Sequence, residues 1–125
     1  MKNYGGEKRQ YSSEELEIIE LFGRVLRKTR KLLHISQDTL ALESQVSQNF
    51  VSKFEKGYGA TRNFEHGVAL IIEGLLSIWH WDCLKGIFRK PIWIKQVQKR
   101  GVFKCRWYFE KFLEDSEDDL EVNYE

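Results

Sequence analysis

The stretch that decides the fold is SQDTLALESQVSQNFVSKFEKG, which runs from Ser36 to Gly57. Ser36 and Ser47 each precede a short run with helical spacing, and the two serines stand eleven residues apart. Serine is a favoured N-cap residue because its hydroxyl accepts a hydrogen bond from a backbone N–H of the first turn. Gly57 suits the left-handed conformation that often follows a helix. The stretch therefore predicts two short helices, beginning after Ser36 and after Ser47, with a tight turn between them.

Helical patterns continue on both sides of this stretch. Upstream, the sequence SSEE at residues 12–15 is a capping-box pattern, and apolar residues recur at helical spacing from Leu16 to Leu33. Downstream, an apolar stripe follows Asn63, and we expect a further short helix over about Trp79–Phe88. We therefore expect a mainly α fold, with a five-helix domain over residues 12–88 that follows a flexible arm over residues 1–11.

Residues 89–125 form an extension beyond this domain. After Pro91, the only proline, the segments IWIKQVQ and VFKCRWYF are rich in aromatic and β-branched residues, and QKRG lies between them. Such runs around a glycine-containing turn are typical of a β-hairpin. We expect a hairpin here, with a continued helix as the alternative, and then a disordered acidic tail, EDSEDDLEVNYE.

Charge is sorted along the chain, although the formal net charge is only +1. Residues 21–31 hold five basic residues and no acid, and residues 85–106 hold eight basic residues and no acid. Residues 112–125 hold seven acids and no base. The near-neutral sum therefore hides basic surfaces, suited to an acidic partner, beside an acidic end.

The composition argues against several function classes. The two cysteines, Cys83 and Cys105, form no CxxC motif, and the three histidines have no ligand partner at metal-binding spacing. We therefore expect no metal site and no cofactor, and since no nucleophile–base motif occurs we expect no enzyme. The N-terminal residues are polar, and no apolar run reaches the roughly 18 residues of a membrane span. A cytoplasmic protein without a membrane segment is the expectation.

The helix that follows Ser47 carries side chains suited to reading DNA. Its apolar residues gather on one side, and the other side carries amide, hydroxyl and ammonium groups: Gln48, Asn49, Ser52 and Lys53. Glutamine and asparagine can bond bidentately to adenine, and lysine can donate to guanine. A merely solvated helix face is the alternative interpretation of such residues.

With these motifs in view, the segment Phe22–Leu76 resembles the phage repressor/Cro (XRE) family of DNA-binding domains, of the lambda-repressor-like fold. The resemblance rests on LRKTR, ISQDTLA and VSQNFVSKFEKG. It implies a helix-turn-helix whose second short helix is the DNA reader. It also implies a structural ion pair between Arg30 and Glu55. Matching positions imply DNA contacts at Gln37, Ser47, Gln48, Asn49, Ser52, Lys53, Tyr58 and Arg62. The resemblance also implies that Gln37 supports the reading helix.

The sequence departs from the family pattern at three positions. Gln45 in the turn and His34 after the first helix both stand where the family usually has glycine. A non-glycine residue in the left-handed region costs on the order of 1 kcal/mol, so an altered turn is expected. Phe50 is bulky for its position, and it either packs inward or touches a thymine methyl group.

The sequence as a whole predicts a sequence-specific DNA-binding transcriptional regulator. We expect a homodimeric repressor that binds double-stranded DNA at a palindromic operator through its third helix. Contacts with the dimer mate or a partner are expected at Trp79, Trp81, Phe88, Ile92 and Trp93. The alternative is an antitoxin-like or regulator-binding module of the same fold, which would bind a protein partner through residues 89–125.

Overall fold

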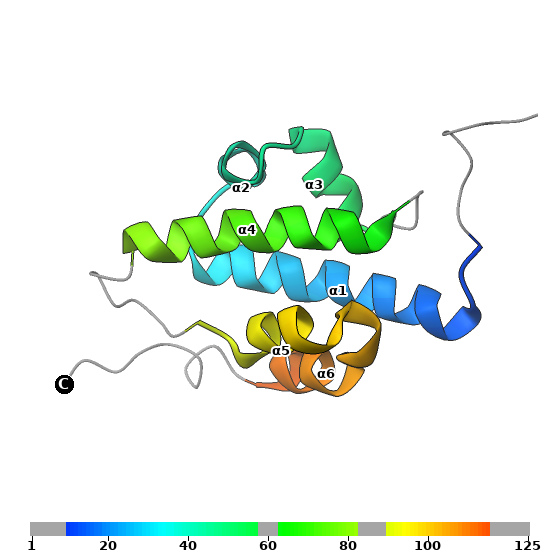
Figure 1. The fold of residues 1–125 in the computed structure, drawn as a ribbon. Helices are drawn as coiled ribbons and strands as arrows, with labels where there is room; N and C mark the ends of the chain where they lie inside the picture. The colour runs from blue at the N-terminus through cyan, green and yellow to red at the C-terminus, as the bar shows by residue number, and fades with distance from the viewer. Residues whose placement is uncertain (1–9, 58–62, 83–89, 116–125) are drawn as a thin grey trace, which may run out of the picture.

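The structure, a computed structural model, describes residues 10–57, 63–82 and 90–115. Within these ranges the chain forms helices and no strand, so the expectation of a mainly α fold is confirmed. In order, the elements are α1 (Ser13–Leu32), α2 (Gln37–Ser44), α3 (Gln48–Glu55), α4 (Phe64–Asp82), α5 (Ile92–Arg100), the 3-10 helix η2 (Val102–Lys104) and α6 (Arg106–Glu114). Figure 1 shows α2 and α3 above α4 and α1, with α5, η2 and α6 below them.

The helix starts predicted from the sequence are confirmed by their capping bonds. The Ser12 hydroxyl accepts from the Glu15 N–H at 3.1 Å, and the Glu15 carboxylate accepts from the Ser12 N–H at 3.0 Å. At both Ser36 and Ser47, the hydroxyl accepts from the backbone N–H three residues later at 3.0 Å. These bonds satisfy backbone donors that a helix start would otherwise leave unpaired, so they fix where α1, α2 and α3 begin.

The fourth helix is longer than the sequence pattern indicated. α4 runs without interruption from Phe64 to Asp82, so the separate helix expected to begin at Trp79 is wrong. No glycine or proline interrupts residues 75–82, and backbone hydrogen bonding continues through them. Residues 83–89, the rest of that expected helix, lie outside the described residues.

The β-hairpin expected after Pro91 is also wrong. Residues 92–100 form α5, residues 106–114 form α6, and Gly101, at φ +92°, joins α5 to η2. The helix buries Trp93, Ile94 and Val97 on one side, whereas a strand would send the first two to opposite faces. A preference for β structure at aromatic and β-branched residues largely reflects side-chain packing, and here a helix provides that packing.

One aromatic side chain joins the two ends of the chain in a single core. Phe22, at the middle of α1, is completely buried. Four rings from α3, α4, α5 and α6 make edge contacts with it, at centroid distances of 6.2, 5.8, 5.7 and 5.8 Å: Phe54, Phe64, Trp93 and Phe109. Such contacts add to the free energy gained by burying each ring. The C-terminal helices and the helices around residues 36–57 therefore share one hydrophobic core.

The described cysteine, Cys105, belongs to this core and not to a reactive site. Its thiol is fully buried and donates to the Gly101 carbonyl oxygen at 3.3 Å. Burial raises the pKa of the Cys105 thiol, and the nearby positive charge of Arg100 opposes this shift only in part. The thiol therefore stays protonated and weakly nucleophilic at neutral pH.

Replacing Trp93 by alanine tests whether the C-terminal helices stabilise the whole fold. Trp93 is 1% exposed, so Trp93→Ala should lower the free energy of unfolding by about 3–5 kcal/mol, as for other buried large-to-small changes. Trp107, which is 64% exposed on α6, provides the control, and Trp107→Ala should change stability by no more than about 0.5 kcal/mol. Urea denaturation followed by circular dichroism measures both. Equal effects would contradict a shared core.

Candidate nucleic-acid interface

Helix α3 is held so that its polar side faces outward. α1 approaches it closely at Gly23, where an added Cβ atom would collide with the Phe54 carbonyl oxygen. Val51 and Phe54 are buried beneath the helix. On the opposite side, three of the predicted DNA-reading residues are exposed and the fourth, Ser52, is partly exposed: Gln48, Asn49, Ser52 and Lys53. The fold therefore presents these four side chains together on one surface.

Phe50 packs inward, which decides between the two interpretations of this residue. Its ring stacks on Phe54 at 4.8 Å between centroids, with 23° between the ring planes. A Cβ at Gly67, in the first turn of α4, would lie 3.0 Å from the tip of the Phe50 ring. Phe50 therefore fills the gap between α3 and α4.

The turn between α2 and α3 keeps a left-handed residue even without glycine. Gln45 adopts φ 60° and ψ 43°, and its N–H donates to the Leu42 carbonyl oxygen at 3.2 Å. The Val46 N–H then donates to the Ala41 carbonyl oxygen at 3.0 Å. His34, after α1, is likewise left-handed at φ 59°. The expectation that glutamine alters the turn is wrong, because the surrounding helices and hydrogen bonds hold Gln45 in the unfavourable conformation.

Gln45→Gly should therefore stabilise the protein. Glycine adopts positive φ without the steric cost that glutamine meets, and its greater freedom in the unfolded chain offsets part of the gain. We expect the free energy of unfolding to rise by about 0.5–1 kcal/mol. Gln98→Gly, at an exposed helical position in α5, should lower it by about 1 kcal/mol. Thermal unfolding of both variants tests the assignment, and destabilisation by Gln45→Gly would contradict it.

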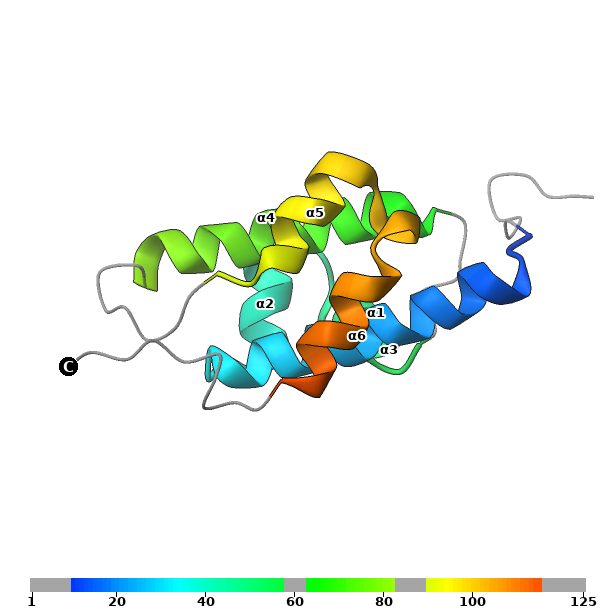
Figure 2. The ribbon, with the colours of Figure 1, turned by 90° about the horizontal axis from the view of Figure 1, so that it is seen from below.

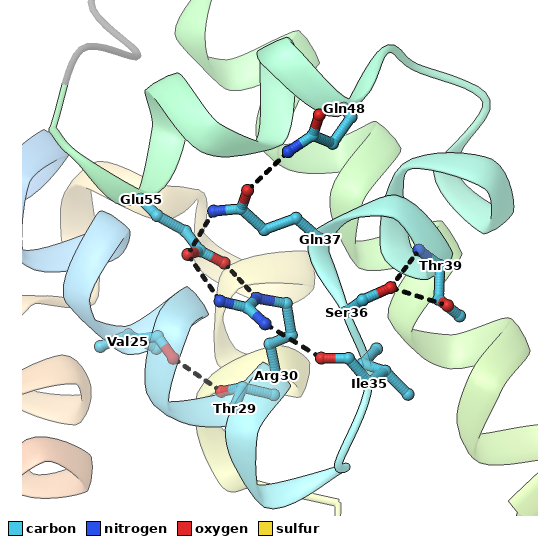
Figure 3. A network of polar contacts seen from close by, with 9 residues as sticks. All are labelled: Val25, Thr29, Arg30, Ile35, Ser36, Gln37, Thr39, Gln48 and Glu55. Atoms are coloured by element: carbon cyan, nitrogen blue, oxygen red, sulfur yellow. Dashed lines mark hydrogen bonds and ion pairs between the residues drawn. The ribbon is translucent and has the colours of Figure 1, made fainter.

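An ion pair ties the end of α1 to the end of α3. Arg30 donates from Nε to Glu55 Oε2 at 2.6 Å and from Nη2 to Glu55 Oε1 at 3.0 Å (Figure 3). Its Nη1 donates to the Ile35 carbonyl oxygen at 3.0 Å. The side chains of Arg30 and Glu55 are only 13% and 2% exposed. Two parallel bonds fix direction as well as distance, so this pair sets how α3 leans on α1.

Two glutamines extend this pair to the exposed start of α3. Gln37 Nε2 donates to Glu55 Oε1 at 3.0 Å, and Gln48 Nε2 donates to Gln37 Oε1 at 2.9 Å (Figure 3). The family resemblance implies that Gln37 supports the reading helix, and the structure adds that it does so by a direct hydrogen bond to Gln48. Their spacing of eleven residues, one at the start of each short helix, was the available signal.

Removing one partner of the ion pair should destabilise the fold strongly. Glu55→Gln leaves the Arg30 guanidinium nearly buried without its carboxylate, which should cost about 3–5 kcal/mol of unfolding free energy. Glu110 supplies the control because it pairs with Arg106 at 3.1 Å on an exposed surface. Glu110→Gln should leave stability nearly unchanged. Chemical denaturation compares the two variants, and a small effect of Glu55→Gln would show that the pair is not a structural tie.

The remaining predicted site residues fall into two groups. Tyr58, Arg62 and Phe88, and the side chain of Trp81, lie outside the described residues. Among the predicted partner contacts, Trp79 and Trp93 are 6% and 1% exposed, so both side chains pack within the chain itself. Ile92, by contrast, is 70% exposed. Among the described residues predicted to contact a partner, it is the one whose side chain is available for that contact.

Helices α2 and α3 form a helix-turn-helix: each begins at a capping serine, and α3 turns its polar side outward. Residues 26–63 match the helix-turn-helix family model. The matched helix-turn-helix segment covers just under a third of the 125 residues, and it confirms the resemblance to the phage repressor/Cro (XRE) type. No curated protein and no solved structure matches the chain. A helix-turn-helix of this family supports a DNA-binding regulator.

The part of the chain that the structure describes holds neither a metal-binding cluster nor a membrane-spanning helix. Within residues 10–57, 63–82 and 90–115, no group of three or more His, Cys, Asp or Glu side chains could hold a metal ion. In the same residues, no helix combines the length and apolar character needed to cross a bilayer.

Proposed function

We propose that this protein is a sequence-specific transcriptional regulator that reads the major groove with the outward side of α3. The observation that carries the proposal is the hydrogen-bonded chain from Glu55 through Gln37 to Gln48. It connects a buried carboxylate to an exposed amide at the start of α3. Specific recognition is favoured by side chains that are already held in one orientation. These hydrogen bonds hold Gln48 in that way before DNA binds.

The buried carboxylate also fixes which atoms Gln48 offers to a base. A carboxylate only accepts hydrogen bonds, so Gln37 must turn its amide nitrogen to Glu55 and its oxygen to Gln48. Gln48 must then donate to Gln37, which leaves its own oxygen and one N–H for DNA. One acceptor beside one donor matches the N6 and N7 edge of adenine, whereas guanine offers two acceptors there. We therefore expect adenine at the base pair that Gln48 contacts.

Phosphate contacts would hold this reader in position. Ser47 lies at the start of α3, where exposed N–H groups and the helix dipole favour an anion. Gln37 is the first residue of α2, next to the N-cap Ser36, and the family resemblance adds Tyr58 and Arg62 after α3. Lys53, exposed on the reading side, is suited to guanine. Such contacts position the protein, while Gln48, Asn49, Ser52 and Lys53 discriminate bases.

The size of α3 favours a dimer. α3 has eight residues, so it is about 12 Å long and spans roughly four base pairs. Two copies related by a twofold axis would read two half-sites about one helical turn apart, on a palindromic operator. A protein that occupies such a site over a promoter acts as a repressor. The resemblance to phage repressors implies a bacterial or phage regulator, which would act in the cytoplasm. Ile92 is a candidate for the dimer contact because it is a large exposed apolar residue.

Selection of bound duplexes from a randomised DNA library tests this function. At about physiological salt we expect enrichment of two half-sites centred about one turn apart, with adenine preferred at one position in each. Gln48→Ala should cost about 1–3 kcal/mol on the selected site and remove the preference at that position alone. Lys53→Ala should do the same at another position.

Arg62→Ala provides the matched comparison. A phosphate contact carries no sequence information, so this variant should weaken selected and random duplexes equally and make the salt dependence shallower. If Gln48→Ala lowered affinity for random DNA as much as for the selected site, Gln48 would not read a base. If no sequence were enriched, the protein-binding alternative would replace the proposal, and a partner at residues 89–125 would be sought.

A further inference from the structure

A basic hollow lies on the side of the molecule, between α1, the end of α3 and the end of α6. It has a volume of about 310 Å³ and is lined by Arg24, Arg27, Lys28, Lys31, Glu55 and Leu113. The four basic residues lie on three successive turns of α1, with Arg27 and Lys28 on the middle one. Figure 2 shows α6 crossing α1 at an angle, with the C-terminal end of α6 over the C-terminal half of α1.

Three of these cations are uncompensated. Arg24, Arg27 and Lys31 are exposed, and none makes a hydrogen bond or ion pair with another residue of the described chain. Glu55 does not offset them, because its carboxylate already accepts two hydrogen bonds from Arg30 and one from Gln37. The hollow therefore holds concentrated positive charge, which favours an anionic occupant.

The fourth cation fixes where the chain leaves α6. Lys28 Nζ donates to the carbonyl oxygens of Phe112 and Asp115, both at 2.6 Å, and lies 5.0 Å from the centre of the Phe112 ring. Lys28 therefore binds the last turn of α6 against α1. At 1.5 Å per residue, Arg24 and Lys31 lie only about 6 Å and 4.5 Å from Lys28 along the helix axis.

The sequence that follows this anchor has the complementary charge. Residues 116–125 contain five acids and no base, and four of these acids fall in SEDDLE at residues 116–121. An extended chain spans about 3.3 Å per residue, so residues 117–121 can reach both ends of the hollow from Asp115. Because the segment is covalently attached beside the hollow, its local concentration there is high.

We propose that the acidic segment 116–121 binds in the basic hollow between α1, α3 and α6. Its carboxylates pair with Arg24, Arg27 and Lys31, while Lys28 holds the preceding residues in place. The bound segment puts negative charge beside the C-terminal end of α3 and occupies cations that would otherwise attract any polyanion. It therefore acts as a built-in competitor that weakens non-specific attraction to nucleic acid.

Nuclear magnetic resonance of the full-length chain tests this proposal. The variant E117Q/D118N/D119N/E121Q keeps the length and shape of the segment and removes its charge. At about 20 mM salt, the Nε–Hε signals of Arg24 and Arg27 should differ between the native chain and this variant. At about 1 M salt, where the screening length falls to about 3 Å, the difference should largely disappear.

The control neutralises acids elsewhere on the surface. Glu65 and Glu73 line a different hollow, between α4 and α5, so E65Q/E73Q should leave the Arg24 and Arg27 signals unchanged. If the segment variant left both arginine signals at their native positions at low salt, the proposal would be overturned. It would also be overturned if those signals moved only when a random DNA duplex was added, because the hollow would then be a phosphate site. The test needs no DNA to support the proposal, so its result is independent of the proposed regulator function.

Discussion

The bidentate ion pair between Arg30 and Glu55 is the constraint on which the DNA-facing surface depends. It joins the last turn of α1 to the last turn of α3, almost out of contact with water. A charge in that position must be paired, so α3 cannot rotate away from α1 without exposing or orphaning one partner. Gln37 and Gln48 then take their orientation from the same carboxylate. The ion pair thus links the packing of the helices to the atoms that face solvent.

The hydrophobic core around Phe22 also holds α1 in place, through contacts with the other helices. Rings from α3, α4, α5 and α6 meet at this residue, so the C-terminal helices brace the same helix, α1, that carries Arg30. α5 and α6 cover the side of α1 away from α2 and α3, as Figure 1 shows. This leaves the polar side of α3 uncovered, and the aromatic residues after Pro91 serve largely to complete the core.

The sequence predicted the parts of the fold that local chemistry determines. Ser36 and Ser47 marked the two short helices because capping needs only nearby backbone groups, and the Gln48 to Lys53 pattern showed which side of α3 faces outward. Trp93 shows where such reasoning fails: an aromatic residue in a β-branched run fits a strand or a buried helix equally well until its neighbours are known. The resemblance implied that Gln37 supports the reading helix, but its bond to Gln48 could not be predicted, because that bond depends on the angle between two helices. The prediction of an altered turn at Gln45 failed for another reason. Tertiary contacts overcame the local preference of glutamine for negative φ.

A double-mutant cycle for DNA binding tests most directly whether the buried pair orients the reader. Affinity for the selected operator would be measured for the native protein, Gln37→Ala, Gln48→Ala and the double variant, with random DNA as the reference. If Gln37 holds Gln48 in its reading orientation, the two losses should overlap, giving a coupling energy of about 1 kcal/mol or more on the operator and none on random DNA. Strictly additive losses would contradict the interpretation, because Gln48 would then read its base without the support of the buried network.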